Sequence, residues 1–271
     1  MLIEIPTRGR PEWLASTLAQ LVQAVPGLQQ PVEVMIIPGE PSEPTEQAEA
    51  AIKALVWSGV TIGVNPVPDS TPLPEKHQLA YDYAKENGHD LVMIMHDDLI
   101  MYPGFLYLLQ KAMNDGTIGA IAGVYPCLAL DMLGFLPEDY HDNPDFNGKI
   151  EAATNWHQVY LYTKEDQQHE PIRTDVEHLF GPVMYRVSAL PQGFPVGVYS
   201  RTSHREETDF THQILCNGHK LGVCKGALAF HAMYPKAGAA EDRAANMSED
   251  DSRFQERLSA RHRSDEPLSP S

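Results

Sequence analysis

The chain has 271 residues, 42% of them hydrophobic and 21% charged, with a formal net charge of −17 at pH 7. This composition is typical of a globular protein with one large core. The negative charge disfavours an extended interface with DNA, RNA or anionic lipid, because phosphate binding needs clustered Lys and Arg. No stretch approaches the roughly 20 apolar residues that cross a bilayer, and we recognise no signal-peptide pattern. The three cysteines have neither metal-site spacing nor the even count of a disulfide framework, so we expect a cytosolic protein.

The first half of the chain alternates short apolar runs with segments that have apolar residues at helical spacing. We expect strands at 2–5, 32–37, 60–64 and 90–95, and helices at 12–25, 44–59 and 75–88. Pro11 suits a first helical turn, and Gly59 suits a helix end. This alternation predicts an α/β fold with a parallel, doubly wound sheet, in which ligands bind outside the carboxyl ends of the strands.

The second half is less regular, and we expect a mixed arrangement there. It offers a helix at 103–115, strands at 118–125 and 157–163, an apolar stretch broken by Gly-Pro at 178–190, a helix at 206–219, and a last strand or hairpin at 221–235. We interpret residues 1–235 as a single domain, with a nucleotide-binding half (1–125) and an acceptor half (126–235).

The stretch 236–271 is polar, poor in aromatic residues and rich in charges of both signs. Such a composition is typical of a solvated tail or a loose helix that packs weakly. A lid over a binding site is the alternative.

Three short segments carry residues suited to chemistry. The fourth strand ends on "HDD" (96–98), whose two adjacent carboxylates either face water or hold a divalent cation such as Mg²⁺ or Mn²⁺ together with substrate phosphates. "EETDF" (206–210) opens a helix with an acidic first turn, which the helix dipole favours. His231 ends an apolar strand. Each feature alone is equally compatible with an ordinary structural role.

The order of these segments resembles that of a GT-A glycosyltransferase. The resemblance rests on "IPTRGRP" after the first strand, "HDD" after the fourth, "EETDF" followed by "NGHKLGV", and a closing "AFH". It covers about residues 1–235 and is most similar to the large family-two type of nucleotide-sugar transferases. It implies a metal-dependent transfer of a sugar from a nucleotide-diphosphate donor, with UDP favoured, to a hydroxyl acceptor that the sequence does not identify.

The resemblance also assigns the cation site. "HDD" matches the family's acidic D-x-D triplet but departs from it at His96, which could accept a ribose hydroxyl. Asp98 aligns with the carboxylate that reaches the metal, and Asp97 with the position near the donor's ribose or sugar. His231 matches a histidine that completes the metal shell, and imidazole is an acceptable Mn²⁺ ligand. A cation would stabilise the charge that grows on the leaving nucleoside diphosphate.

The donor's nucleotide is implied to bind at the first strand. The matching loop makes candidates of Pro6, Thr7, Arg8 and Arg10. Lys76 fits a basic position that faces the donor phosphates.

The acidic helix is implied to serve the acceptor. Glu207 takes the place of the general base of inverting members, with a longer arm than the usual Asp, and Glu206 is the alternate base. Asp209 would cap or orient the helix, and Trp156 could stack on a sugar.

Two other functions stay open. A nucleotidyltransferase has a similar sheet and also uses a cation, but it would carry a Gly-rich phosphate loop where "PTRGRP" has a single Gly. A non-catalytic carbohydrate- or nucleotide-binding domain would bind without turnover. For a transferase, the acceptor could be a glycan, a protein, a small molecule or a modified nucleic acid. A lipid acceptor is disfavoured, because we see neither a membrane span nor a basic amphipathic helix.

Overall fold

The computed structural model describes residues 1–7, 11–39, 46–124, 172–174, 176–179, 181–200, 205–231 and 240–264. The strands are β1 (Leu2–Thr7), β2 (Glu33–Pro38), β3 (Thr61–Val64), β4 (Leu91–Ile94), β5 (Leu99–Met101), β6 (Ile118–Val124), β7 (Ile172–Arg173), β8 (Val183–Arg186) and β9 (Lys220–His231). The helices are α1 (Pro11–Ala24), α2 (Glu46–Trp57), α3 (Leu73–Glu86), α4 (Phe105–Ala112), α7 (Glu206–Cys216) and α8 (Ala240–Ser264), with short 3-10 turns η1 (Val25–Gly27) and η4 (Val187–Ala189).

The nine strands of the described residues belong to one sheet, in the order β3-β2-β1-β4-β8-β6-β9-β5, and β7 pairs with β9. The neighbours β3, β2, β1 and β4 are parallel. Strand β8 runs antiparallel between β4 and β6, while β6 and β9 are parallel again and β5 and β7 are antiparallel to β9. The prediction of a parallel, doubly wound first half and a mixed second half is therefore confirmed.

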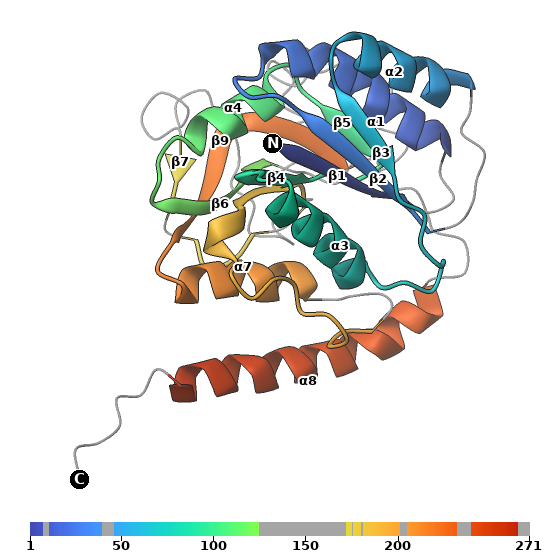
Figure 1. The fold of residues 1–271 in the computed structure, drawn as a ribbon. Coiled ribbons are helices and arrows are strands. Elements are labelled where there is room, and N and C mark those ends of the chain that lie inside the picture. Colours follow the sequence, from blue (N-terminus) through green and yellow to red (C-terminus); the bar gives the residue numbers. More distant parts are fainter. Residues whose placement is uncertain are drawn as a thin grey trace, which may run out of the picture.

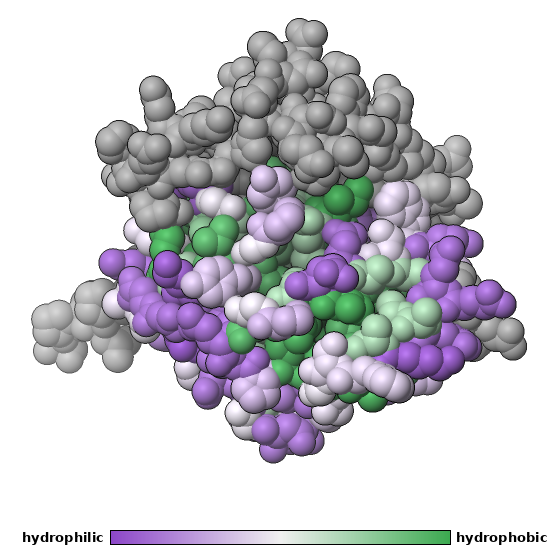
Figure 2. All heavy atoms as spheres, turned by 90° about the horizontal axis from the view of Figure 1, so that it is seen from above, coloured by the Kyte–Doolittle hydropathy of each residue, from purple (hydrophilic) through white to green (hydrophobic). Residues whose placement is uncertain are grey.

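Helices cover both faces of the sheet. In Figure 1, α1, α2 and α4 lie on one face, α3 and α7 lie on the other, and α8 runs beyond α7. Two hydrophobic clusters follow from the alternation of side chains along each strand: Ile3 and Ile5 of β1 pack on the α1 side, and Leu2 packs on the α3 side. On the outer surface over α1 and α2, hydrophobic residues show between hydrophilic ones (Figure 2).

The predicted elements of the first half are all present, and local sequence explains their ends. Pro11 opens α1, as expected of a proline in a first turn. Pro74 lies in the first turn of α3, which begins two residues before the predicted start. Gly59, after α2, has a φ of 82°, a left-handed conformation that glycine adopts at little cost. In the described part of the chain, no helix has the length and apolar composition that a membrane span needs.

Three features that follow "HDD" in the chain differ from the sequence expectations or add to them. A short strand, β5, follows "HDD" directly and was not predicted. The last apolar stretch is a single strand of 12 residues, β9, rather than a hairpin. The apolar stretch broken by Gly-Pro contains β8. The strand predicted at 157–163 lies outside the described residues.

The C-terminal stretch forms a 25-residue helix, α8, that packs on the rest of the protein. Phe254 is only 8% exposed, and Asp250 is fully buried. The Asp250 carboxylate accepts hydrogen bonds from the backbone N–H of Ser200 (2.7 Å) and from its hydroxyl (2.6 Å). Residues 240–264 are therefore helical, one of the forms expected for this stretch, and Asp250 and Phe254 are buried where this helix meets the rest of the protein.

Candidate functional site

The "PTRGRP" and "HDD" segments meet at the carboxyl edge of the sheet. Strand β1 pairs in parallel with β4, with Glu4 opposite Ile94. Three residues further along each chain, the same register brings Thr7 level with Asp97. The Thr7 hydroxyl donates a hydrogen bond of 2.6 Å to Oδ2 of Asp97. The parallel pairing thus joins two segments that are 90 residues apart in the sequence.

Asp97 and Asp98 lie in the tight connection between β4 and β5. The Thr17 hydroxyl, on α1, donates to the backbone carbonyls of Asp97 (2.9 Å) and Leu99 (3.2 Å), which holds this connection against the helix. The exposed fractions of Asp97 and Asp98 are 1% and 0%. The pair is therefore buried, which excludes the alternative that both carboxylates simply face water. Burying a carboxylate requires compensating donors or positive charge.

Lys76 brings positive charge to the same edge. Its side chain is 5% exposed, and its Nζ donates to the backbone carbonyl of Thr7 at 3.3 Å. A Cβ atom on Gly39, just after β2, would lie 2.9 Å from that Nζ and 3.5 Å from Oδ1 of Asp69. The absence of a side chain at Gly39 therefore leaves room for the Lys76 ammonium beside the residue that hydrogen-bonds Asp97.

A buried pair fixes the helix that carries Lys76. His77, the next residue on α3, hydrogen-bonds through Nδ1 to Oε1 of Glu4 on β1. The two residues are 1% and 0% exposed. This pair was not predicted from the sequence, although the single charged residue inside the apolar run "LIEI" was a visible signal. The contact attaches the start of α3 to the middle of β1, so that Lys76 lies over the end of the strand.

Helix α7 places Glu207 next to the "HDD" segment. Oε1 of Glu207 accepts a hydrogen bond from the backbone N–H of Gly181 at 3.2 Å and lies 3.8 Å from Nε2 of His96. The side chains of His96 and Glu207 are 24% and 23% exposed. The predicted general base is therefore partly exposed, which leaves room for an acceptor hydroxyl to approach it. The alternate base, Glu206, is only 6% exposed.

Asp209 points away from this edge, toward α8. It is fully buried and accepts hydrogen bonds from the Tyr199 hydroxyl (2.8 Å), from Nε of Arg257 (2.6 Å) and from Arg261. Burial and the neighbouring Asp209 charge raise the pKa of Tyr199 well above its ordinary value, so this hydroxyl stays a donor. The expected orienting role of Asp209 thus concerns the packing of α7 on α8.

Of the remaining predicted residues, two have a described backbone and three lie outside the described residues. His231 is the last residue of β9, and its backbone pairs with Leu99, which follows Asp98 directly. Pro6 lies in β1, paired with Ile37 of β2. The side chain of His231 lies outside the described residues, as do Arg8, Arg10 and Trp156.

The carboxylate oxygens at this edge suit a divalent cation whose coordination shell is completed by phosphates. Within the described ranges, no cluster of three or more Cys, His, Asp or Glu side chains could hold a metal by itself. Mg²⁺ and related cations, however, are commonly held by one or two carboxylates together with substrate phosphates. Asp97 and Asp98 supply such carboxylates in a buried setting, so the residues present fit a divalent cation bound with a diphosphate.

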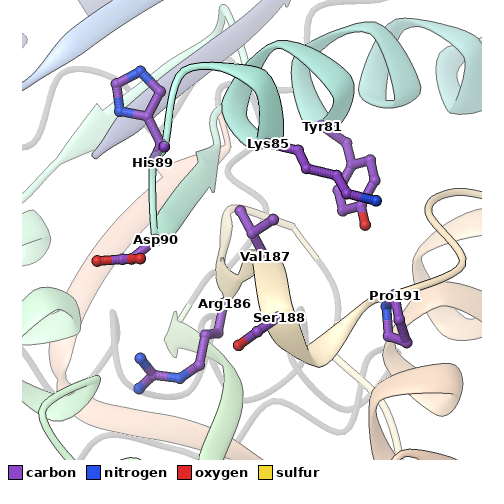
Figure 3. A pocket seen from close by; sticks show the side chains of 9 residues that line it. Tyr81, Lys85, His89, Asp90, Arg186, Val187, Ser188 and Pro191 are labelled. Atoms are coloured by element: carbon purple, nitrogen blue, oxygen red, sulfur yellow. The ribbon is translucent and has the colours of Figure 1, made fainter.

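A separate cavity of about 380 Å³ lies at the opposite end of β4. Figure 3 shows its walls, with Tyr81 and Lys85 from α3 facing Arg186, Val187 and Ser188. The Lys85 ammonium lies 5.9 Å from the centre of the Tyr81 ring. No residue predicted from the sequence lines this cavity, which places it apart from the carboxylates.

Comparisons with known proteins identify the fold. Neither the protein-family models nor the curated proteins gave a match to this sequence. Among solved structures, S. aureus TarS 1–349 in complex with UDP-GlcNAc matches with a TM-score of 0.54 at 13% identity, over 91% of this chain and 60% of that one. A mannosyltransferase from Pyrobaculum calidifontis, PcManGT, in complex with GDP-Man and Mn²⁺, matches with a TM-score of 0.54 at 14% identity, over 94% and 64%.

The chain therefore spans less than two thirds of the length of these two proteins. At such low sequence identity, the structural similarity is evidence for the fold alone. This chain has a GT-A-like glycosyltransferase fold, which confirms the fold expected from the order of its motifs.

Proposed function

We propose that this protein is a glycosyltransferase that moves a sugar from a nucleotide-diphosphate sugar to a hydroxyl acceptor with the help of a divalent cation. The observation that carries the proposal is the contact of Thr7 with the buried Asp97, beside the Lys76 ammonium, at the carboxyl edge of the sheet. In a doubly wound sheet this edge is where ligands bind. The two matched structures contain UDP-GlcNAc and GDP-Man. UDP remains our favoured nucleotide.

The donor side would use the residues around Thr7. Asp98 and His231 would hold the cation, with Asp97 beside the donor's ribose or sugar. When bound, the cation would supply charge that stabilises the leaving nucleoside diphosphate. Lys76 would add a point charge toward the phosphates. The Thr7 hydroxyl holds the Asp97 carboxylate in one orientation, while Pro6, Arg8, Arg10 and His96 would contact the base and ribose.

The acceptor side would use Glu207. Its Oε1 is oriented by the Gly181 N–H, and the side chain keeps partial access to solvent. In an inverting transfer, Glu207 takes the proton from the acceptor hydroxyl as that oxygen attacks the anomeric carbon, and the nucleoside diphosphate leaves from the opposite side.

A donor screen tests this proposal. The purified protein is incubated with UDP-, GDP-, TDP- and CMP-sugars, with Mn²⁺ or with EDTA, and free nucleotide is measured. We expect Mn²⁺-dependent release from one donor, and its loss in Asp98→Ala. Asp90→Ala is the matched control, because Asp90 is an exposed aspartate at the opposite end of β4. That variant should release nucleotide at the wild-type rate.

The other outcomes separate the alternatives. Calorimetric binding of a donor without release, even with candidate acceptors present, would favour a non-catalytic binding domain. Pyrophosphate formation from a nucleoside triphosphate and a sugar phosphate would identify a nucleotidyltransferase. Failure to bind any of the four donor classes would contradict the proposal.

A further inference from the structure

Helix α8 contacts the segment that leads into α7 and α7 itself through a set of buried or partly buried polar contacts. Val198 and Ser200 lie in the segment that precedes α7. Arg253 of α8 donates to the carbonyl of Val198 (2.6 Å), and Asp250 of α8 accepts from Ser200. On α7 itself, Asp209 accepts from Arg257 and Arg261. Figure 1 shows α8 running past α7 on the side away from the sheet.

The carboxylate of Asp209 needs hydrogen-bond donors because Asp209 is fully buried. An isolated buried carboxylate is strongly unfavourable, whereas one that accepts charge-assisted hydrogen bonds is tolerated. Two of its three described donors, Arg257 and Arg261, come from α8, and Tyr199 supplies the third. The first turn of α7 is therefore compatible with a buried Asp209 only while α8 is docked.

A strained residue at the start of α7 depends on the same helix. Arg205, directly before Glu206, has a φ of 88°, which is uncommon for a residue with a side chain. Its Nε donates to Oδ1 of Asp251 on α8 at 2.6 Å. Such a conformation persists when the surrounding contacts hold it. This contact links the residue at which the chain enters the acidic first turn to α8.

Glu207 lies on the opposite side of that turn. Residues two apart on a helix point about 200° apart, because an α-helix has 3.6 residues per turn. While Asp209 faces α8, Glu207 faces Gly181 and His96. The contacts therefore run in sequence from α8, through the first turn of α7, to the "HDD" edge of the sheet.

We propose that Arg257 and Arg261 are positioning residues that hold the first turn of α7, and with it the carboxylate of Glu207, in place for the acceptor. This inference rests on the proposed function, since Glu207 is the base of that reaction. It makes helix α8 part of the catalytic unit.

The test compares substitutions that remove the arginines with one that keeps their charge. In the full-length protein, Arg257→Gln with Arg261→Gln should speed amide hydrogen exchange in 205–211 without speeding it in β1 or α3. With the donor found by the screen and an acceptor, kcat should fall by about 10- to 100-fold, because displacing a reacting group by about 1 Å costs about that much. The KM for the donor should change less than about threefold, since the donor-side residues belong to other elements.

Two controls show whether positioning is the cause. Arg257→Lys with Arg261→Lys keeps both charges and should restore most of kcat. Glu256→Gln removes an exposed charge from the same helix without touching Asp209, so it should leave kcat unchanged. If the double Gln variant fails to fold, Tyr199→Phe removes the third donor and should produce a smaller change in the same peptide.

Two results would overturn the inference. One is unchanged exchange in 205–211, and the other is faster exchange there with wild-type kcat. A wild-type protein that turns over no donor is a different result. It would count against the proposed function, while the exchange experiment would still show whether α8 holds α7.

Discussion

At the scale of single residues, the proposed site is built from side chains whose partners are far away in the sequence. Thr7 hydrogen-bonds Asp97, and Glu207 approaches His96. Strands β1 and β4 and helix α7 hold the backbone segments that carry these side chains. The chemistry proposed for a residue therefore depends on the element that presents it, and two neighbours on one helix can be told apart by where they point.

The two neighbours Glu206 and Glu207 provide such a comparison. We expect Glu207→Gln to lower kcat by about 10²- to 10⁴-fold, because an amide cannot accept the acceptor's proton. Donor affinity, measured by calorimetry, should stay near the wild-type value. Glu206→Gln is the matched variant and should retain most of the turnover, since that side chain is only 6% exposed. The reverse ranking would make Glu206 the base.

At the scale of elements, the packing of the second half depends on close contacts at β6. A Cβ atom on Gly123 would lie 2.3 Å from the carbonyl oxygen of Ala227 on β9 and 2.5 Å from Cε2 of Phe105 on α4. Real Cβ atoms do not approach other atoms so closely, and one of these contacts is with backbone. Strand β6 can therefore lie between β9 and α4 only with glycine at this position.

Gly123→Ala should accordingly destabilise the protein. We expect a loss of about 1–3 kcal/mol or more in the free energy of unfolding, the usual cost of forcing an extra carbon into a packed core. The urea midpoint measures it. Gly116→Ala is the control, because a Cβ there would have no neighbour within 4 Å. Equal midpoints for the two variants would contradict this account of β6.

Sequence patterns predicted the elements whose stabilising contacts show as local periodicity, and missed those that depend on distant partners. Helices α1 to α3 repeat apolar residues at helical spacing, so their existence could be predicted. Strand β5 has three residues, and its partner strand is more than 120 positions later. The docking of α8 was missed because its arginines resemble solvated charges. Their spacing of four, at Arg253, Arg257 and Arg261, together with Phe254, was the available signal.

The candidate site shows the same division. The positions of Thr7, Lys76 and Asp97 followed from strand ends and from the motif order, and the structure brings these residues together. The supporting contacts of Thr17 and of the pair Glu4 and His77 could not be predicted. They depend on which side of a helix meets which strand, and a single sequence does not reveal that.

At the scale of the whole molecule, one sheet crosses the boundary between the two halves inferred from the sequence. Strand β4 of the first half pairs with β8 of the second, and β8 pairs with β6. Separating the halves would expose the backbone hydrogen-bonding groups of these central strands. The structure therefore favours a single cooperative unit, as expected for the proposed single domain.

Equilibrium unfolding should show this cooperativity. We expect one urea transition, with the same midpoint by tryptophan fluorescence and by far-UV circular dichroism. Trp13, which is half-buried, reports on α1, while circular dichroism reports on all helices, including α8. An early loss of helix content before the fluorescence change would mean that part of the chain, such as α8, unfolds independently.

The position of the Asp209 partners also has a consequence in time. Arg257 and Arg261 follow Asp209 by 48 and 52 residues. At a synthesis rate of about 5–20 residues per second, they are made roughly 2–10 s after it. Thr7, Lys76 and Asp97, by contrast, all belong to the first 100 residues. A growing chain therefore contains all three of these donor-side residues before the arginines of α8 that bind the helix carrying Glu207 have been synthesised.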